Sequence, residues 1–194
     1  SSCRSNLKFI TSSSCVLSDV VVERCTSKEG GAVYTSGVGS EWTWRGGAIR
    51  NNVAGQTAAG LIVDHTAVTG TATGPTLMNV LIEHNRGGSS YSPGAGAILL
   101  TSPSHVPSLK SILTVIGSEF QGNFGQGWTK QQRRRALGAE VESNENGDGM
   151  VENDILVYGT QAKLVLVDTV FASPHGVIDR YDAEDVSTKQ PTRA

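Results

Sequence analysis

The chain has 194 residues, which suits one domain or one elongated array and allows a continuous buried core. Its formal net charge is −2, so no global field favours nucleic acid or an anionic membrane as a partner. No apolar run approaches the ~20 residues that a membrane helix needs, so we expect no membrane insertion by this segment. The surface is rich in Ser, Thr, Asn and Gly, as is common in extracellular β proteins.

The chain begins Ser-Ser-Cys rather than with Met, so we expect a processed chain or part of a longer one. The apolar run 7–10 resembles the end of a structural unit begun earlier in that longer chain. All three cysteines, Cys3, Cys15 and Cys25, lie in the first 25 residues. They are candidates for a local disulfide in an oxidising compartment, with three thiols of no special role as the alternative.

An internal repeat then appears in five copies of unequal spacing. Its central apolar residues are Val22, Ile49, Ile82, Phe120 and Phe171. Five positions earlier lie the apolar residues Leu17, Trp44, Leu77, Val115 and Leu166, and three positions earlier the small or turn-forming residues Asp19, Gly46, Asn79, Gly117 and Asp168. Three positions later lie Cys25, Asn52, Asn85, Asn123 and Pro174. Asparagines stacked at a corner can bond to one another and to backbone, which predicts a ladder of Asn52, Asn85 and Asn123.

A second apolar block opens on Gly in each copy, at 31–34, 60–63, 96–99, 138–141 and 176–178. Each repeat therefore offers two short strands, and only 131–141 is compatible with a short helix. Unequal repeats favour a parallel β-helix over a propeller or sandwich, because stacked coils need only their inward residues preserved. We predict an all-β, single-stack right-handed parallel β-helix (solenoid) of five to six irregular coils. It covers 1–178, with 124–154 as a long inserted loop and 179–194 as a polar tail.

Two groups of short motifs carry a family resemblance over roughly 17–125. The segments 30–33 and 46–49, with Ile49-x-x-Asn52, Ile82-x-x-Asn85 and Phe120-x-x-Asn123, resemble the GGAI and FxxN motifs of polymorphic outer-membrane-protein repeats. The resemblance implies a right-handed parallel β-helix in a surface-exposed domain, without implying an autotransporter. Gly46-Gly47 leads straight into the Asn motif instead of following it, so the second coil is where we expect the register to depart from the motif pattern.

Candidate chemistry was weighed against structural roles. Asp19 and Asp168 share a column but would lie four coils apart, roughly 19 Å at ~4.8 Å per strand, which is too far for a catalytic pair. Glu23, Arg50 and Glu83 would alternate in sign on neighbouring strands, as cross-strand pairs or as a substrate-binding stripe.

The remaining candidates are histidines and a basic cluster. Asp64-His65 and Glu83-His84 are neighbour pairs whose side chains would point to opposite faces of a strand, so we expect no dyad. The only basic cluster is a candidate contact for polyanions, with neutralisation by the acidic residues that follow as the alternative. It consists of Lys130, Arg133, Arg134 and Arg135.

These patterns favour a non-catalytic structural or adhesive segment of an extracellular or cell-surface protein. We expect its loops to contact other protein subunits, further repeats of the same parent chain or glycans, with no catalytic residue, metal or cofactor. The alternative is a carbohydrate-active β-helix resembling a polysaccharide lyase or glycoside hydrolase, or a carbohydrate-binding one.

Overall fold

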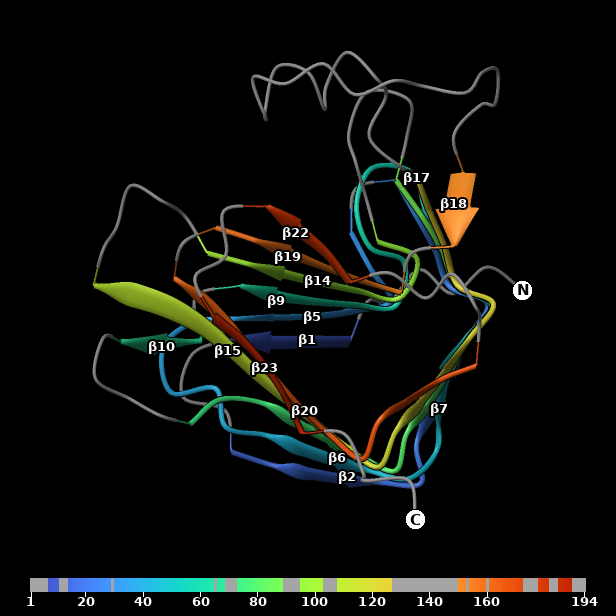
Figure 1. Cartoon of the computed structure of the whole chain (residues 1–194). Coiled ribbons are helices and arrows are strands. Elements are labelled where there is room, and N and C mark those ends of the chain that lie inside the picture. The colour runs from blue at the N-terminus through green and yellow to red at the C-terminus, as the bar shows by residue number, and fades with distance from the viewer. Residues whose placement is uncertain are drawn as a thin grey trace, which may run out of the picture.

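The computed structural model describes residues 7–10, 14–28, 30–64, 66–68, 73–88, 95–102, 108–126, 150–152, 154–159, 161–172, 178–181 and 185–189. Within these residues the protein is all-β, without a helix. Short strands stack into four sheets, as predicted for a β-helix or solenoid (Figure 1). Pairing is parallel except where β10 meets β15 and where β17 meets β18.

Two sheets hold the strands that carry the predicted columns. Sheet I runs in the order β2 (Val16–Ser18), β6 (Thr43–Arg45), β11 (Thr76–Met78), β15 (Leu109–Ile116), β20 (Ala162–Val167) and β23 (Asp185–Lys189), with β10 (Ala67–Val68) beside β15. Sheet II runs in the order β3 (Val21–Glu23), β7 (Ala48–Arg50), β12 (Leu81–Glu83), β16 (Glu119–Gln121) and β21 (Val170–Phe171).

The other two sheets complete the circuit. Sheet III runs in the order β4 (Thr26–Ser27), β8 (Val53–Ala54), β13 (Arg86–Gly87), β17 (Phe124–Gln126) and β18 (Met150–Glu152). Sheet IV runs in the order β1 (Leu7–Ile10), β5 (Val33–Ser36), β9 (Leu61–Asp64), β14 (Ile98–Thr101), β19 (Ile155–Tyr158) and β22 (Ile178–Tyr181). After β1 the chain visits sheets I, II, III and IV in that order four times, and the described strands of the last circuit lie in sheets I, II and IV before β23 returns to sheet I. One such circuit is called a coil below.

The predicted columns are confirmed as strand register. In sheet II the central apolar residues are successive Cα partners from Val22 to Phe171. In sheet I the earlier apolar residues are partners from Leu17 to Leu166. Members from the middle coils, such as Trp44 and Ile82, have no exposed surface and form one hydrophobic core.

The corner between sheets I and II explains the column of small and turn-forming residues. Asp19, Asn79 and Asp168 have φ between 48° and 55°, and Gly46 and Gly117 have φ of 67° and 57°. This left-handed conformation suits Gly, Asn and Asp better than other residues. The second coil keeps this register despite its Gly-Gly, as the pairing of β7 with β3 and β12 shows. Its second glycine, Gly47, has no room for a side chain, because a Cβ there would lie 2.0 Å from the Val20 carbonyl oxygen.

The structure corrects the second predicted block. The sheet IV strand of the fourth coil is β19, which pairs with β14. The predicted block 138–141 and the whole helix-compatible segment 131–141 lie outside the described residues. Gly60 aligns with Ala97, so the glycine column is shifted by one residue in the second coil. A glycine therefore does not fix the first residue of a sheet IV strand, because the register follows the buried residues of the strand.

Two predicted boundaries also differ from the structure. Within 124–154, β17 extends sheet III from β13, and β18 returns antiparallel to β17. Residues 127–149 between them lie outside the described residues. Within 179–194, which was assigned to a polar tail, β22 and β23 pair with β19 and β20. Backbone pairing needs no apolar run, so a polar composition did not reveal these strands.

Candidate functional site

Three asparagines form a buried ladder at the corner between sheets II and III. Asn52, Asn85 and Asn123 are at most 1% exposed. The Asn52 Nδ2 donates to Asn85 Oδ1 at 2.9 Å, and the Asn85 Nδ2 donates to Asn123 Oδ1 at 2.9 Å. Each carboxamide thus acts as donor on one side and acceptor on the other.

The asparagine ladder also binds backbone groups of the neighbouring coils. The backbone N–H of Asn52 donates to Asn85 Oδ1 at 3.2 Å, and that of Asn85 to Asn123 Oδ1 at 3.1 Å. The Nδ2 atoms of Asn52, Asn85 and Asn123 donate to the carbonyls of Val22, Ile49 and Ile82, at 3.2, 2.9 and 2.9 Å. Only a short carboxamide offers a donor pair and an acceptor there, which accounts for the residue type.

The ladder ends differently on its two sides. In the first coil Cys25 takes the asparagine position, and its backbone N–H donates to Asn52 Oδ1 at 3.0 Å. On the other side the Asn123 Nδ2 donates to the carboxylate of Asp154 at 2.8 Å. Asp154 is 1% exposed and was missed from sequence, because it precedes β19 rather than occupying the repeat column. The sequence feature that could have identified Asp154 is an acidic residue directly before an apolar strand.

A second cluster, the charge ladder, lies on the outer face of sheet II. Arg50 is the Cα partner of both Glu23 and Glu83, which confirms the predicted alternation. Its Nε lies 2.8 Å from Glu23 Oε2, and its Nη1 lies 3.7 Å from Glu83 Oε1. The hydrogen bond to Glu23 and then that carboxylate's charge raise the pKa of Arg50 above its ordinary value, and Glu83 adds to the effect.

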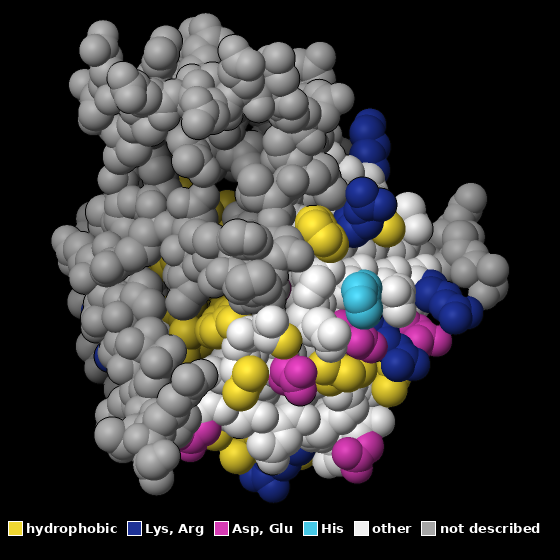
Figure 2. Space-filling model, turned by 45° about the vertical axis from the view of Figure 1, so that its right-hand side comes forward, with side chains coloured by type: hydrophobic (Ala, Val, Ile, Leu, Met, Phe, Trp, Pro, Cys, Tyr) yellow, Lys and Arg dark blue, Asp and Glu magenta, His cyan; other side chains and the backbone are white. Residues whose placement is uncertain are grey.

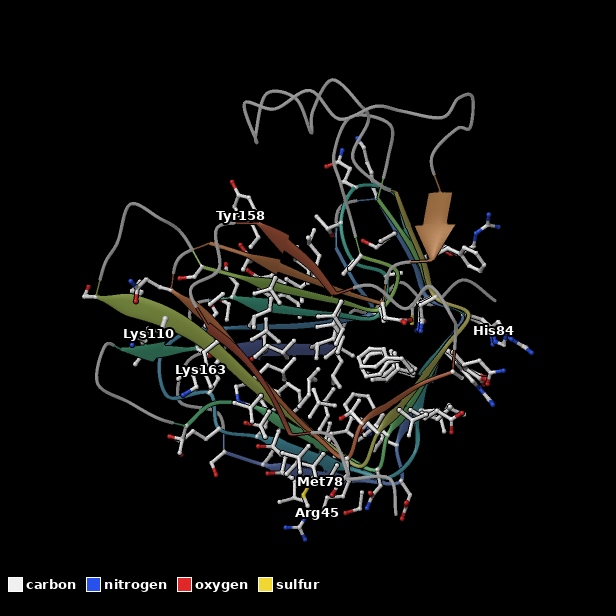
Figure 3. All side chains as sticks on the ribbon, viewed as in Figure 1. Arg45, Met78, His84, Lys110, Tyr158 and Lys163 are labelled. Atoms are coloured by element: carbon white, nitrogen blue, oxygen red, sulfur yellow. The ribbon has the colours of Figure 1, made fainter. Side chains whose placement is uncertain are left out.

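His84 corrects the prediction that the Glu83-His84 pair points to opposite faces. Its Nδ1 lies 3.5 Å from Glu83 Oε2. The alternation rule fails because His84 follows β12 in a left-handed turn, with φ of 52°. The side chain is exposed and points away from the core (Figure 3). Histidine, acidic and basic side chains gather on this face of the molecule (Figure 2).

The other candidates were not brought together. Cys15 is exposed beside sheet I and Cys25 is buried beside sheet III, and the two do not bond to each other, because they lie at different sheets. Outside the described residues lie Cys3, His65, Lys130, Arg133, Arg134, Arg135 and Pro174. Asp19 and Asp168 occupy equivalent turns in the first and last coils of sheet II.

Two other kinds of feature, a metal centre and a membrane-spanning helix, are absent from the residues that the structure describes. The described part of the chain contains no group of three or more His, Cys, Asp or Glu side chains placed to hold a metal ion. Among the same residues, no helix is long and apolar enough to span a membrane. Comparisons with protein-family models, curated proteins and solved structures found no match.

Proposed function

We propose that this chain is a non-catalytic structural or adhesive segment of an extracellular or cell-surface protein, built as a single right-handed parallel β-helix of five to six coils. Right-handedness follows the strong preference of parallel β crossovers for that hand. The resemblance of its GGAI-like and FxxN-like motifs to polymorphic outer-membrane-protein repeats supports the same reading.

The observation that carries the proposal is how the conspicuous polar residues are used. The asparagine ladder is buried and joins coils to one another, so its amides do not face a ligand. The charge ladder pairs adjacent strands of one sheet. Asp19 and Asp168, the two carboxylates that share a column, occupy turns with a left-handed backbone conformation. These side chains maintain the stack, which leaves the loops to contact partners.

The insertion between β17 and β18 is the proposed contact region for partner proteins or glycans, and its basic cluster is the proposed polyanion contact. Gln126 and Met150 are Cα partners, so an Asn-Gly turn can replace 127–149 and close a hairpin. We expect this variant to keep the thermal transition of the parent chain and to lose retention on an immobilised uronic-acid polysaccharide. Equal retention by both proteins would refute the loop assignment.

A matched variant separates charge from the loop itself. Changing Lys130, Arg133, Arg134 and Arg135 to Gln keeps the length of the insertion and removes its cations. Retention should fall as in the deletion if polyanions are the ligand. Formation of unsaturated product from the same polysaccharide, with or without Ca²⁺, would instead favour the lyase alternative.

A further inference from the structure

The first coil leaves one end of the stack uncovered in sheets I and II. β2 pairs only with β6, and β3 pairs only with β7, within the described residues. The inward residues Leu17 and Val22 are only partly buried, although later members of the same columns are fully buried. Outward from the same strands, Val16 is 59% and Val21 is 49% exposed. Among the described residues, nothing covers the hydrophobic core at this end.

The same backbone hydrogen bonds join every coil of sheet II to the one before it. The donors are the N–H groups of Ala48, Leu81, Glu119 and Val170, and the acceptors are the carbonyls of Val20, Gly47, Val80 and Ser118. The equivalent donor at the open edge is the Val21 N–H, which has no acceptor among the described residues. In sheet I the Thr43, Thr76 and Thr114 N–H groups follow the same rule, and Val16 is their edge equivalent.

Acceptors repeat in the same way. The carbonyls of Arg50, Glu83 and Gln121 accept N–H groups from the preceding coil. The equivalent Glu23 carbonyl is approached by the Cys25 thiol, at 3.7 Å, which is a weak donor. The edge sequence 16–23, Val-Leu-Ser-Asp-Val-Val-Val-Glu, contains none of the Lys or Pro residues that blunt exposed edges. Such an edge is suited to strand addition.

We propose that the β2–β3 edge is an interaction surface for one further coil of parallel strands that carries the residue pattern of the coils already stacked. The inference rests on the stacked β-helix proposed above. The added coil must continue the columns of the coils already stacked. It therefore places an apolar residue over Leu17, a residue in the left-handed conformation over Asp19 and an apolar residue over Val22. Because Cys25 lacks a carboxamide, the added coil is held by strand pairing and not by the asparagine ladder.

The path of the chain sets the length of connection that such a coil needs. The first four coils pass from sheet II through sheet III to sheet IV, and β1 already occupies sheet IV. In the first two complete coils this passage runs from Glu23 to Val33 and from Arg50 to Leu61. A coil engineered onto this edge therefore needs a passage of similar length before Leu7.

A second copy of the chain does not fit the edge equally well. Sheet II ends at β21, whose far edge is the natural mate of β3. Seating β3 of a second copy on β21 would place its β2 on β20, where β23 already lies. The first-coil edge therefore favours a separate coil over head-to-tail self-association.

The test extends the chain by one coil. A copy of 41–54 is fused directly ahead of Ser1, which sets the copied Arg50 as far from Leu7 as Arg50 is from Leu61. Hydrogen exchange should slow by about tenfold or more in segment 14–23, because the edge amides acquire partners. Segment 161–172, at the other end, should not change. The control fusion carries Trp44→Asp and Ile49→Asp in the copied segment and should leave exchange in 14–23 unchanged.

Three outcomes would overturn the proposal. Equal exchange of 14–23 with both fusions would show that the edge does not select a coil. A second outcome is that exchange of 14–23 in the unextended chain slows as the protein concentration rises, with association detected by sedimentation. That result would identify a second copy of the chain as the occupant. Rapid exchange of 76–85 in the unextended chain would refute the stacked fold and therefore also the proposed edge. Slow exchange of 76–85 together with equal exchange of 14–23 in both fusions would refute the proposed edge alone.

Discussion

The two corners that flank sheet II solve the same geometric problem with different chemistry. Each turns the chain with a left-handed residue, at Asn79 between sheets I and II and at His84 between sheets II and III in the third coil. Asn79 is exposed, and its column contains Asp, Gly and Asn. The second corner adds a buried asparagine, Asn85, directly after its left-handed residue.

The difference shows what each position demands. A left-handed turn on the surface needs only a tolerated φ, so several residue types serve. A buried ladder position must donate to one coil and accept from another, so only a carboxamide of the right length serves. Asparagine is therefore interchangeable at one corner and required at the other, and substitutions at the two corners can be compared directly.

The largest effect is expected at the centre of the asparagine ladder. Asn85→Ala removes the side-chain bonds that Asn85 donates to Asn123 Oδ1 and to the Ile49 carbonyl and the two that it accepts from Asn52, and leaves buried groups without partners. We expect a loss of about 3–5 kcal/mol in the free energy of unfolding, measured by urea denaturation. Asn79→Gly in the same coil is the matched control and should change stability by less than about 1 kcal/mol. Similar losses for both variants would contradict the distinction.

An intermediate effect is expected from Gly47→Ala at the corner between sheets I and II. The added Cβ would approach the Val20 carbonyl oxygen, and the residue would keep a φ of +77°. Together these should cost about 2–3 kcal/mol in stability, read from the shift of the urea midpoint at constant slope. A midpoint equal to that of the parent chain would mean that this corner tolerates a side chain.

A smaller effect is expected one residue earlier, from Gly46→Asn. The added side chain would meet the Asp19 carboxylate, which can rotate away, and Asn79 occupies the same column one coil later. The cost should stay below about 1 kcal/mol by the same urea assay. A loss as large as that from Gly47→Ala would show that the column is not interchangeable.

The smallest effect is expected from Arg50→Gln in the charge ladder. Its partners are partly exposed, and such pairs are screened by salt. The thermal midpoint should fall slightly at low salt, and the difference from the parent chain should vanish at about 1 M NaCl. Because the folded pKa of Arg50 is raised, its stabilisation is complete below the unfolded pKa and is lost only as pH rises through the folded value. No change is therefore expected near neutral pH, and a midpoint difference that persists in high salt would argue for a packing role.

The sequence by itself determined the repeat columns and therefore the register of sheets I and II. Leu17, Trp44 and the later members of their column are all apolar and point inward, without a polar residue among them. The order of short strands separated by left-handed turns follows from the residue types alone. The alternation of Glu23, Arg50 and Glu83 was readable for the same reason, since register fixes outward neighbours as well.

Only the tertiary structure decided the remaining contacts, because they join residues whose separation along the chain carries no pattern. After the insertion, stacking on β14 selected Ile155–Tyr158 instead of the glycine-led segment 138–141. The same stacking brought Asp154 to the end of the asparagine ladder. The left-handed turn at His84 allowed its contact with Glu83, which strand alternation had excluded. Local pattern specifies which face is buried, whereas stacking between distant coils selects the partners.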